Sequence, residues 1–121
     1  MSVFKALAEI APLPIWHGVL ARAVEGRDVT FAIVELDPES VVAQHQHPNE
    51  QLGIILTGAL RFHIGAETRD LTPGDTYVIP ANVPHDAVAG PAGAVVIDVF
   101  SPVRADWRQV KPGAPQTPKW P

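Results

Sequence analysis

Short apolar runs, broken roughly every eight to twelve residues by Gly and Pro, are the dominant pattern along the chain. The runs are rich in Val, Ile and Phe, and this spacing is typical of an all-β sandwich or barrel. The pattern predicts strands at Val19–Val24, Val29–Leu36, Val41–His45, Gln51–Leu56, Ala59–Ile64, Thr68–Leu71, Thr76–Ile79, His85–Val88 and Ala94–Phe100. It predicts turns at Glu25-Gly26, Asp37-Pro38, Thr57-Gly58, Ile64-Gly65, Pro73-Gly74 and Gly90-Pro91.

The two ends of the chain depart from this pattern. Residues 2–10 are compatible with one or two turns of amphipathic helix. The last ten residues contain four prolines, which exclude a central strand and leave a loose tail or an extended arm laid across the domain or a neighbour. Trp107 and Trp120 favour the docked arm, because an exposed Trp is costly to leave in water. We expect one domain over residues 1–121, with a metal-binding core at about 29–104 and the arm at 110–121.

Composition narrows the possible functions. The chain has 121 residues, of which 46% are hydrophobic, so one core is possible without covalent staples. The absence of cysteine excludes disulfides, thiolate nucleophiles and Cys-ligated zinc. The net charge of -4, with no basic run, argues against nucleic acid or an anionic membrane as partner. No signal peptide or membrane-spanning apolar stretch is evident, so a cytoplasmic protein is expected.

Three of the five histidines fall in two short segments. His45 and His47 are two residues apart, so on a strand they would point to the same face. A polar residue follows at Gln51, and His85 comes after Ile79-Pro-Ala-Asn-Val-Pro. Nitrogen and oxygen ligands of this kind can close around one metal ion, and in a chain without cysteine no others are available.

The two segments resemble the two motifs of the cupin superfamily. In the first motif, Glu39 stands at the opening Gly position, followed by His45, His47, Gln51 at the Glu position and Gly58. In the second, Gly74, Pro80 and His85 match, Asn82 replaces a Gly, and Ala89 departs from the final Asn. Asn is a tolerable replacement because it accepts a positive φ. The resemblance implies an all-β fold, a double-stranded β-helix or jelly-roll barrel, whose interior holds one metal or small ligand.

The expected metal ligands are His45, His47, Gln51 and His85. Glu50 is a competing ligand, but its neighbour Gln51 has the inward orientation if the strand is regular. Four neutral ligands would leave the full charge of a divalent ion in place, which favours an anionic, chelating substrate. Ni, Fe, Mn, Zn and Cu are all compatible with this set. Gly53 is expected to leave room beside the metal.

Asp98 interrupts an apolar run in the last predicted strand. A carboxylate there is expensive unless it has a purpose or a partner. If it points inward with Phe100, both lie opposite the metal, and Arg104 can reach over the barrel mouth. The structural alternatives are an ion pair of Asp98 with Arg22 or Arg104, a solvated Arg104, and a Phe100 that serves the core alone.

The segment from Asp98 to Arg104, joined to the His-x-His-Pro-x-Glu-Gln motif, resembles the unsaturated pyranuronate lyase (KdgF-type) family. The resemblance implies a metal-dependent lyase or isomerase of carbohydrate metabolism that converts cyclic 4,5-unsaturated uronates to linear keto-uronates. It implies one divalent metal on His45, His47, Gln51 and His85. It also assigns substrate-related roles to Asp98, Phe100 and Arg104, with a small anionic sugar acid as the ligand.

Three alternatives remain open from the sequence. The site fits an Fe-dependent oxygenase acting on a small diketone or alkene, a non-catalytic sugar-acid-binding module, or a barrel with a structural metal. His17 and His63 are expected to have no role, His63 facing solvent if Phe62 packs inward. Because edge strands need cover, we expect a homodimer in which the N-terminal strand or the proline arm supplies it.

Overall fold

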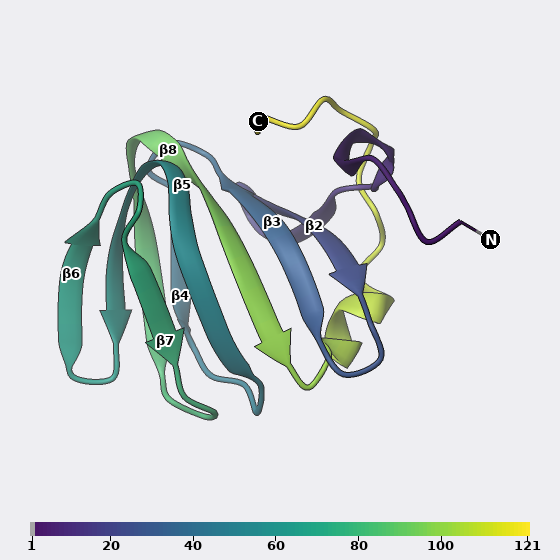
Figure 1. Cartoon of the computed structure of the whole chain (residues 1–121). Helices are drawn as coiled ribbons and strands as arrows, with labels where there is room; N and C mark the ends of the chain where they lie inside the picture. The colour runs from purple at the N-terminus through teal and green to yellow at the C-terminus, as the bar shows by residue number, and fades with distance from the viewer. Residues whose placement is uncertain (1) are drawn as a thin grey trace.

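The computed structural model describes residues 2–121 and shows a barrel of antiparallel strands (Figure 1). Within these residues the strands are β1 (Leu13–Trp16), β2 (Val19–Glu25), β3 (Thr30–Leu36), β4 (Val41–His45), β5 (Glu50–Ile64), β6 (Glu67–Leu71), β7 (Thr76–Ile79) and β8 (His85–Ser101). Two short 3-10 helices, η1 (Leu7–Glu9) and η2 (Ala105–Gln109), flank them. The expected all-β jelly-roll fold is confirmed.

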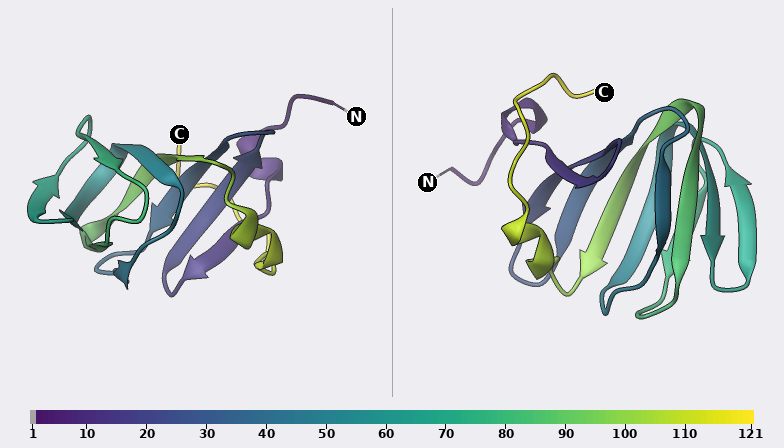
Figure 2. Two further views of the ribbon diagram at one scale, coloured as in Figure 1. Left: turned by 90° about the horizontal axis from the view of Figure 1, so that it is seen from below. Right: turned by 180° about the vertical axis from the view of Figure 1, so that it is seen from behind.

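The long strands β5 and β8, of 15 and 17 residues, run through both layers of the barrel and pair with each other along their lengths. In one layer, the first half of β5 and the second half of β8 are flanked by β7 on one side and by β3, β2 and β1 on the other. In the second layer, their other halves lie between β6 and β4. Figure 2 shows the resulting curvature from below.

The turns predicted at Thr57-Gly58 and Gly90-Pro91 are wrong, because β5 and β8 continue through them. The β5–β8 register shifts between Ile55 and Thr57 and again between Gly58 and Leu60, and such bulges bend a strand without ending it. A Cβ on Gly58, which has a φ of 76°, would lie 2.1 Å from the carbonyl oxygen of Gly93. Glycine at this position therefore permits the close backbone approach at the bend.

The N-terminal prediction also needs correction. Only Leu7–Glu9 are helical, and as a 3-10 turn rather than an amphipathic helix, because Pro12 and Pro14 follow closely and no side chain of η1 is buried. The strand β1 was not among the expected elements. Pro14 within this strand and Pro12 directly before it are compatible with an edge strand that pairs only with β2.

The core fills the barrel interior with side chains of alternating strand positions. It consists of Val19, Ala21, Ala32, Val34, Leu36, Ile55, Leu60, Phe62, Leu71, Tyr77, Ile79, Ala87, Ala89, Ala94, Val96, Phe100 and Trp107. Asn82 adopts the positive φ expected for a residue in place of Gly, at 62°. Glu39, at the other such position, adopts a φ of 60°, so both replacements keep the backbone conformation that glycine favours.

The C-terminal arm lies against the outer face of β2 and β3. There Arg22 and Glu35, which point away from the core, form a buried ion pair at 2.7 Å. Arg22 Nη2 donates to the carbonyl oxygen of Gln116, and Lys119 N–H donates to Glu35 Oε2. Figure 2 shows the arm passing beside the N-terminal segment. No helix among residues 2–121 has the length and apolarity needed to cross a bilayer.

Candidate metal centre

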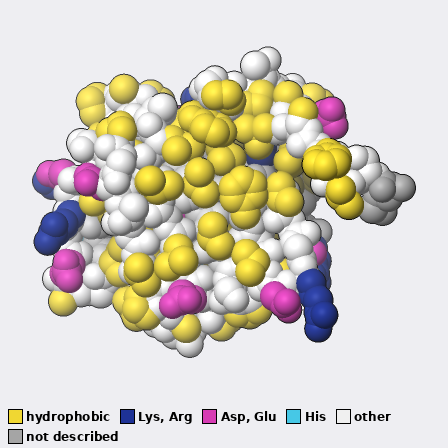
Figure 3. Space-filling model, viewed as in Figure 1, with side chains coloured by type: hydrophobic (Ala, Val, Ile, Leu, Met, Phe, Trp, Pro, Cys, Tyr) yellow, Lys and Arg dark blue, Asp and Glu magenta, His cyan; other side chains and the backbone are white. Residues whose placement is uncertain are grey.

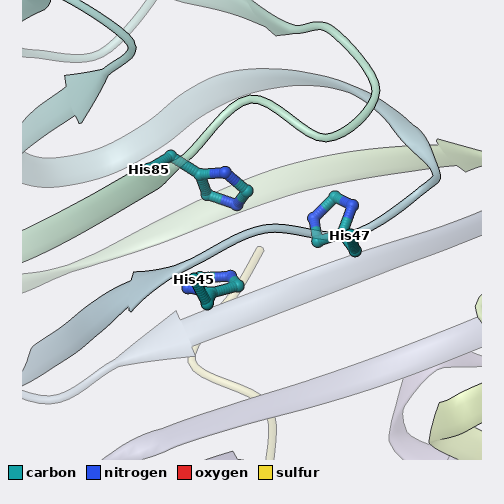
Figure 4. A group of neighbouring side chains, drawn as sticks. All are labelled: His45, His47 and His85. Atoms are coloured by element: carbon teal, nitrogen blue, oxygen red, sulfur yellow. The ribbon is translucent and has the colours of Figure 1, made fainter.

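Strand pairing brings the three motif histidines together at one end of the barrel. His45 ends β4 and His85 begins β8, and these two residues are direct partners in the β4–β8 ladder. His47 lies in the turn between β4 and β5, and its side chain lies beside those of His45 and His85 (Figure 4). The candidate ligand atoms of the three side chains all lie within 4.8 Å of one another. The cluster therefore has the dimensions of a single-ion site.

Each imidazole is oriented by its Nδ1 atom. Nδ1–H of His45 donates to the carbonyl oxygen of Ala43 at 2.8 Å, that of His47 to Asn49 at 3.0 Å, and that of His85 to Val83 at 2.9 Å. These bonds fix the tautomer that leaves the Nε2 lone pair free, as outer hydrogen bonds do at metal-binding histidines. Nε2 of His85 is buried without a hydrogen-bond partner among the described residues.

Gln51 lies beside this cluster, at the start of β5. Its Oε1 atom is 3.1 Å from Nε2 of His47, and its side chain is buried, whereas Glu50 is exposed. With the Nδ1 proton of His47 directed to Asn49, the lone pairs of Nε2 and Oε1 face the same space. Two acceptors that face each other are unfavourable unless a cation joins them. The donor set therefore fits a divalent transition metal held by three imidazoles and an amide oxygen.

Burial keeps two of the imidazoles neutral. It lowers the pKa of His85 to about 4, with the nearby positive charges of His45, His47 and Arg104 acting in the same direction and a hydrogen bond to Val83 opposing them. Burial also lowers the pKa of His47, again with help from the charge of Arg104. A histidine must be unprotonated to bind a metal, so these environments favour the ligand form.

The cluster opens into a cavity of about 350 Å³. Asp98, Phe100 and Arg104 line it together with the histidines and Gln51. The ring of Phe100 lies edge-on to His47, with centroids 5.7 Å apart. The Arg104 guanidinium sits 4.7 Å from the centroid of Phe100 and 4.5 Å from that of Trp107, and it pairs with Asp106 at 2.9 Å.

Asp98 is buried and belongs to this cavity. Its expected alternative partner Arg22 lies on the opposite face of the sheet, bound to Glu35. Asp98 Oδ1 instead accepts a hydrogen bond from the hydroxyl of Tyr77. Burial raises the pKa of Asp98 to about 6, although hydrogen bonds from Tyr77 and Gln51 and the charge of Arg104 oppose the rise. A carboxyl group that titrates near neutrality is suited to acid–base chemistry.

Three residues of the site were missed by sequence reasoning. The ring of Trp16 lies 5.0 Å from that of His45, and Asn49 Nδ2 donates to the carbonyl oxygens of Pro102 and Val103, which tethers the turn of His47 to the segment before Arg104. Tyr77 fills the space above Gly53, so the expectation that Gly53 leaves room beside the metal is wrong. Strand alternation with buried Ile79 was the signal that Tyr77 points inward.

The remaining histidines lie away from the cluster. His63 is 38% exposed and its Nδ1 pairs with Asp86 at 2.9 Å, while Phe62 packs inward as expected. His17 is exposed in the turn between β1 and β2.

Comparisons with known proteins agree with this geometry. The family model of the cupin domain matches residues 32–100, and the chain belongs to the cupin domain family. Within that family it is similar to the pectin degradation protein KdgF of Dickeya dadantii, with 32% identity over 66% of this chain and 74% of that protein. The structure of KdgF from Halomonas sp. superposes with a TM-score of 0.79, at 31% identity, over 88% of this chain and 98% of that one. These similarities support a KdgF-type cupin.

A second relative is the H2HPP isomerase of Bacillus subtilis. It is 34% identical over 59% of this chain, and the match covers 30% of the isomerase. The chain therefore matches about a third of that protein. Together the family, the relatives and the three-histidine cluster indicate a small-molecule enzyme of the cupin type.

Proposed function

We propose that the protein is a metal-dependent enzyme that opens the ring of 4,5-unsaturated uronates and yields linear keto-uronates. The observation that carries this proposal is one cavity that joins the four candidate metal ligands to a buried carboxyl group and a guanidinium. The similarity to two KdgF proteins supports it, because one of them is named for pectin degradation. Pectin is a polymer of uronates, so a sugar acid is the expected substrate class.

His45, His47, Gln51 and His85 would hold the metal through their Nε2 atoms and the amide oxygen. Ni, Fe, Mn, Zn and Cu all remain compatible with these ligands. A divalent ion in this place supplies Lewis-acid polarisation of substrate oxygen atoms. The protein prepares the site by directing the Nδ1 protons away from it and by lining part of the cavity with apolar side chains.

Arg104 would bind the substrate carboxylate. Its Nε and one Nη2 proton are engaged by Asp106, which leaves the Nη1 edge for a second carboxylate. Stacking on Phe100 and Trp107 fixes the plane of the guanidinium, and this reduces the entropy lost on binding. Phe100 also offers an apolar surface to one face of the sugar ring.

Asp98 would move the proton. Ring opening takes the proton from the C1 hydroxyl, forms the C1 carbonyl and breaks the bond between C1 and the ring oxygen. The enol left at C5 becomes a ketone when C4 gains a proton, so the reaction is an isomerisation with no net gain or loss of atoms. A carboxyl group whose pKa lies at about 6 can accept the first proton and return one.

The test follows the absorbance of the conjugated double bond in a 4,5-unsaturated galacturonate or mannuronate, with protein of known metal content. We expect turnover when the metal is present, loss of turnover on chelation, and its return when metal is restored. Turnover should not depend on O2. His47→Ala should abolish it and Asp98→Asn should weaken it. No loss of absorbance with a full complement of metal would overturn the proposal, and O2-dependent turnover would identify an oxygenase instead. Tight binding without turnover would identify a sugar-acid-binding module.

A second candidate is a proton-shifting isomerase that acts on another small anion. The similarity to H2HPP isomerase favours it, and the same Asp98 and metal ligands would serve such a reaction. Turnover of an unsaturated keto acid in place of the uronates, with the same dependence on metal and on Asp98, would distinguish it.

We also propose a homodimer. Val78, Leu52, Val99, Phe31 and Val24 form one row across β7, β5, β8, β3 and β2 on the outer face. Leu52 and Val78 are 44% and 57% exposed, and apolar side chains spread over this face in Figure 3. An exposed apolar sheet face of this kind favours self-association. Light scattering should give a dimer that Leu52→Glu dissociates, and a monomeric native protein at micromolar concentration would contradict it.

A further inference from the structure

Three residues of neighbouring strands lie in one row beneath the candidate metal centre. Gly53 of β5 is the direct partner of Tyr77 on β7 and of Asp98 on β8. Side chains in such a row point to the same face and are about 4.8 Å apart from strand to strand. Tyr77 and Asp98 are therefore separated by one strand, and they can touch only if the residue between them is small.

Gly53 makes this contact possible. A Cβ built on Gly53 would lie 2.1 Å from both Cε2 and Cζ of Tyr77 and 2.3 Å from its hydroxyl oxygen. The ring thus occupies the volume that any other side chain at position 53 would need. It is held there by Phe62, whose ring packs against it edge-on with centroids 4.8 Å apart.

The hydroxyl of Tyr77 ends at the carboxylate of Asp98. It donates to Oδ1, and both side chains are buried, at 8% and 7% exposure. In this setting the phenol stays protonated, because burial and the neighbouring carboxylate raise the pKa of Tyr77 well above its ordinary value. Tyr77 is therefore a permanent donor, and its partner oxygen is fixed.

Gln51 is the diagonal neighbour of Asp98 in the β5–β8 ladder, and both buried side chains line the same cavity. Its Oε1 atom lies 3.1 Å from Nε2 of His47, and its amide, as a hydrogen-bond donor, lowers the pKa of Asp98. The two ends of the amide are thereby distinguished, with its NH2 toward a carboxylate and its oxygen toward the histidines. A Glu at position 51 would instead place a second carboxylate against Asp98.

We propose that Tyr77 is the positioning residue of this site. Lying over Gly53, its hydroxyl holds the Asp98 carboxylate in the orientation that fixes the Gln51 amide oxygen toward the three histidines. Tyr77 acts through Asp98 and Gln51. The catalytic part of the inference rests on the proposed function, whereas the alignment of Gln51 concerns the metal centre alone.

Tyr77 is the only tyrosine of the chain, which allows a direct test without activity. Protein labelled with 13Cζ-tyrosine gives a single ring signal, and that signal should move in Asp98→Asn and in Gly53→Ala. It should stay in place in Thr76→Val, which removes an exposed hydroxyl from the same strand. An unchanged signal in Asp98→Asn would overturn the contact, whether or not Tyr77→Phe folds.

Two further measurements test the consequence. In Tyr77→Phe, Ni²⁺ affinity measured by chelator competition should fall by roughly 10-fold, as for loss of a residue that orients metal ligands. With the unsaturated uronate, kcat should fall by roughly 10- to 100-fold while KM changes little, and Thr76→Val should match the native protein. Native affinity and native kcat in Tyr77→Phe would overturn the role.

The two proposals fail in distinguishable ways. If the native holoprotein does not turn over the uronates, the proposed function fails, and the tyrosine signal and Ni²⁺ affinity still decide the role of Tyr77. If the native protein is active and Tyr77→Phe is equally active with unchanged Ni²⁺ affinity, only the positioning role fails.

Discussion

The sheet that contains β2, β3 and β8 buries charge on both of its faces, in two different ways. On the outer face, Arg22 and Glu35 neutralise each other beneath the C-terminal arm. On the inner face, the carboxyl group of Asp98 has a phenol and an amide as neighbours and faces a cavity. A buried ion pair that is covered by the chain holds both charges in one arrangement. A buried carboxyl group that has neutral hydrogen-bond partners and faces a cavity can still exchange its proton.

The largest effect is expected from a change to the inner cluster. His85→Ala should lower the affinity for a divalent metal by more than about 100-fold and abolish uronate turnover, because a buried ligand nitrogen is lost. The outer ion pair is untouched, so the protein should stay folded. Metal analysis and circular dichroism measure the two consequences. A variant that retains a full complement of metal would show that His85 is not a ligand.

A change on the outer face should affect stability rather than metal binding. Arg22→Ala leaves Glu35 buried without its cation, and this is expected to lower the free energy of unfolding by about 3–5 kcal/mol while leaving metal affinity unchanged. The exposed pair of Arg108 and Glu25 provides the control, since Arg108→Ala should change the free energy of unfolding by less than about 1 kcal/mol.

The double replacement Arg22→Met with Glu35→Leu sharpens this test. Nε of Arg22 and Oε1 of Glu35 lack hydrogen-bond partners within residues 2–121, so the native pair is incompletely satisfied. Apolar residues of similar size should recover most of the lost stability. A double variant as unstable as the single one, in urea unfolding, would mean that the ion pair is itself stabilising.

Asp98→Asn should separate stability from function on the inner face. The pKa of Asp98 rises from 3.8 to about 6 on folding, so the folded state holds this proton more tightly. The stability due to this group is fully present below pH 3.8 and is lost as the pH rises through about 6. Asn cannot lose the proton, so above pH 6 the metal-free variant should be more stable, on the order of 2 kcal/mol, and less active.

Urea unfolding of the metal-free protein between about pH 4 and pH 8 measures this difference. Asp28→Asn, at an exposed carboxyl group, should follow the native pH profile. An Asp98→Asn variant whose stability declines with pH as steeply as that of the native protein would contradict the assignment.

The smallest effect is expected from a change that belongs to neither face. Glu39 adopts a φ of 60°, which an L side chain occupies at a cost of roughly 1 kcal/mol or more. Glu39→Gly should raise the free energy of unfolding by about 1 kcal/mol, partly offset by the greater freedom of the unfolded chain, without altering metal affinity. Asn82→Gly should raise the free energy of unfolding by a smaller amount, because Asn tolerates this conformation. A destabilised Glu39→Gly would mean that the side chain makes a contribution of its own.

Local pattern was sufficient to predict most strands and the histidine cluster. Two-residue spacing and strand parity determine the faces of His45, Phe62 and His63, and a family motif adds His85. The bends in β5 and β8 were not predictable, because Gly58 can equally end a strand or permit close backbone approach within one. The contact of Tyr77 with Asp98 depends on the register of three strands, which local sequence does not reveal. The pairing of Arg22 with Glu35 was likewise not predictable, because it depends on how β2 pairs with β3 and on where the arm lies.

The arm has a consequence for biosynthesis. The hairpin of β2 and β3 brings Arg22 and Glu35 together from neighbouring strands, but Lys119, which completes their cover, is synthesised 84 residues after Glu35. A nascent chain therefore carries this pair in water, where charge is inexpensive, while the residues between Glu35 and Lys119 are translated. Desolvation comes as a late event, when the emerging arm closes over a sheet that is already paired. Pulse-labelling hydrogen exchange on stalled chains would detect it as late protection of the Lys119 amide, while the amides between β2 and β3 are protected earlier.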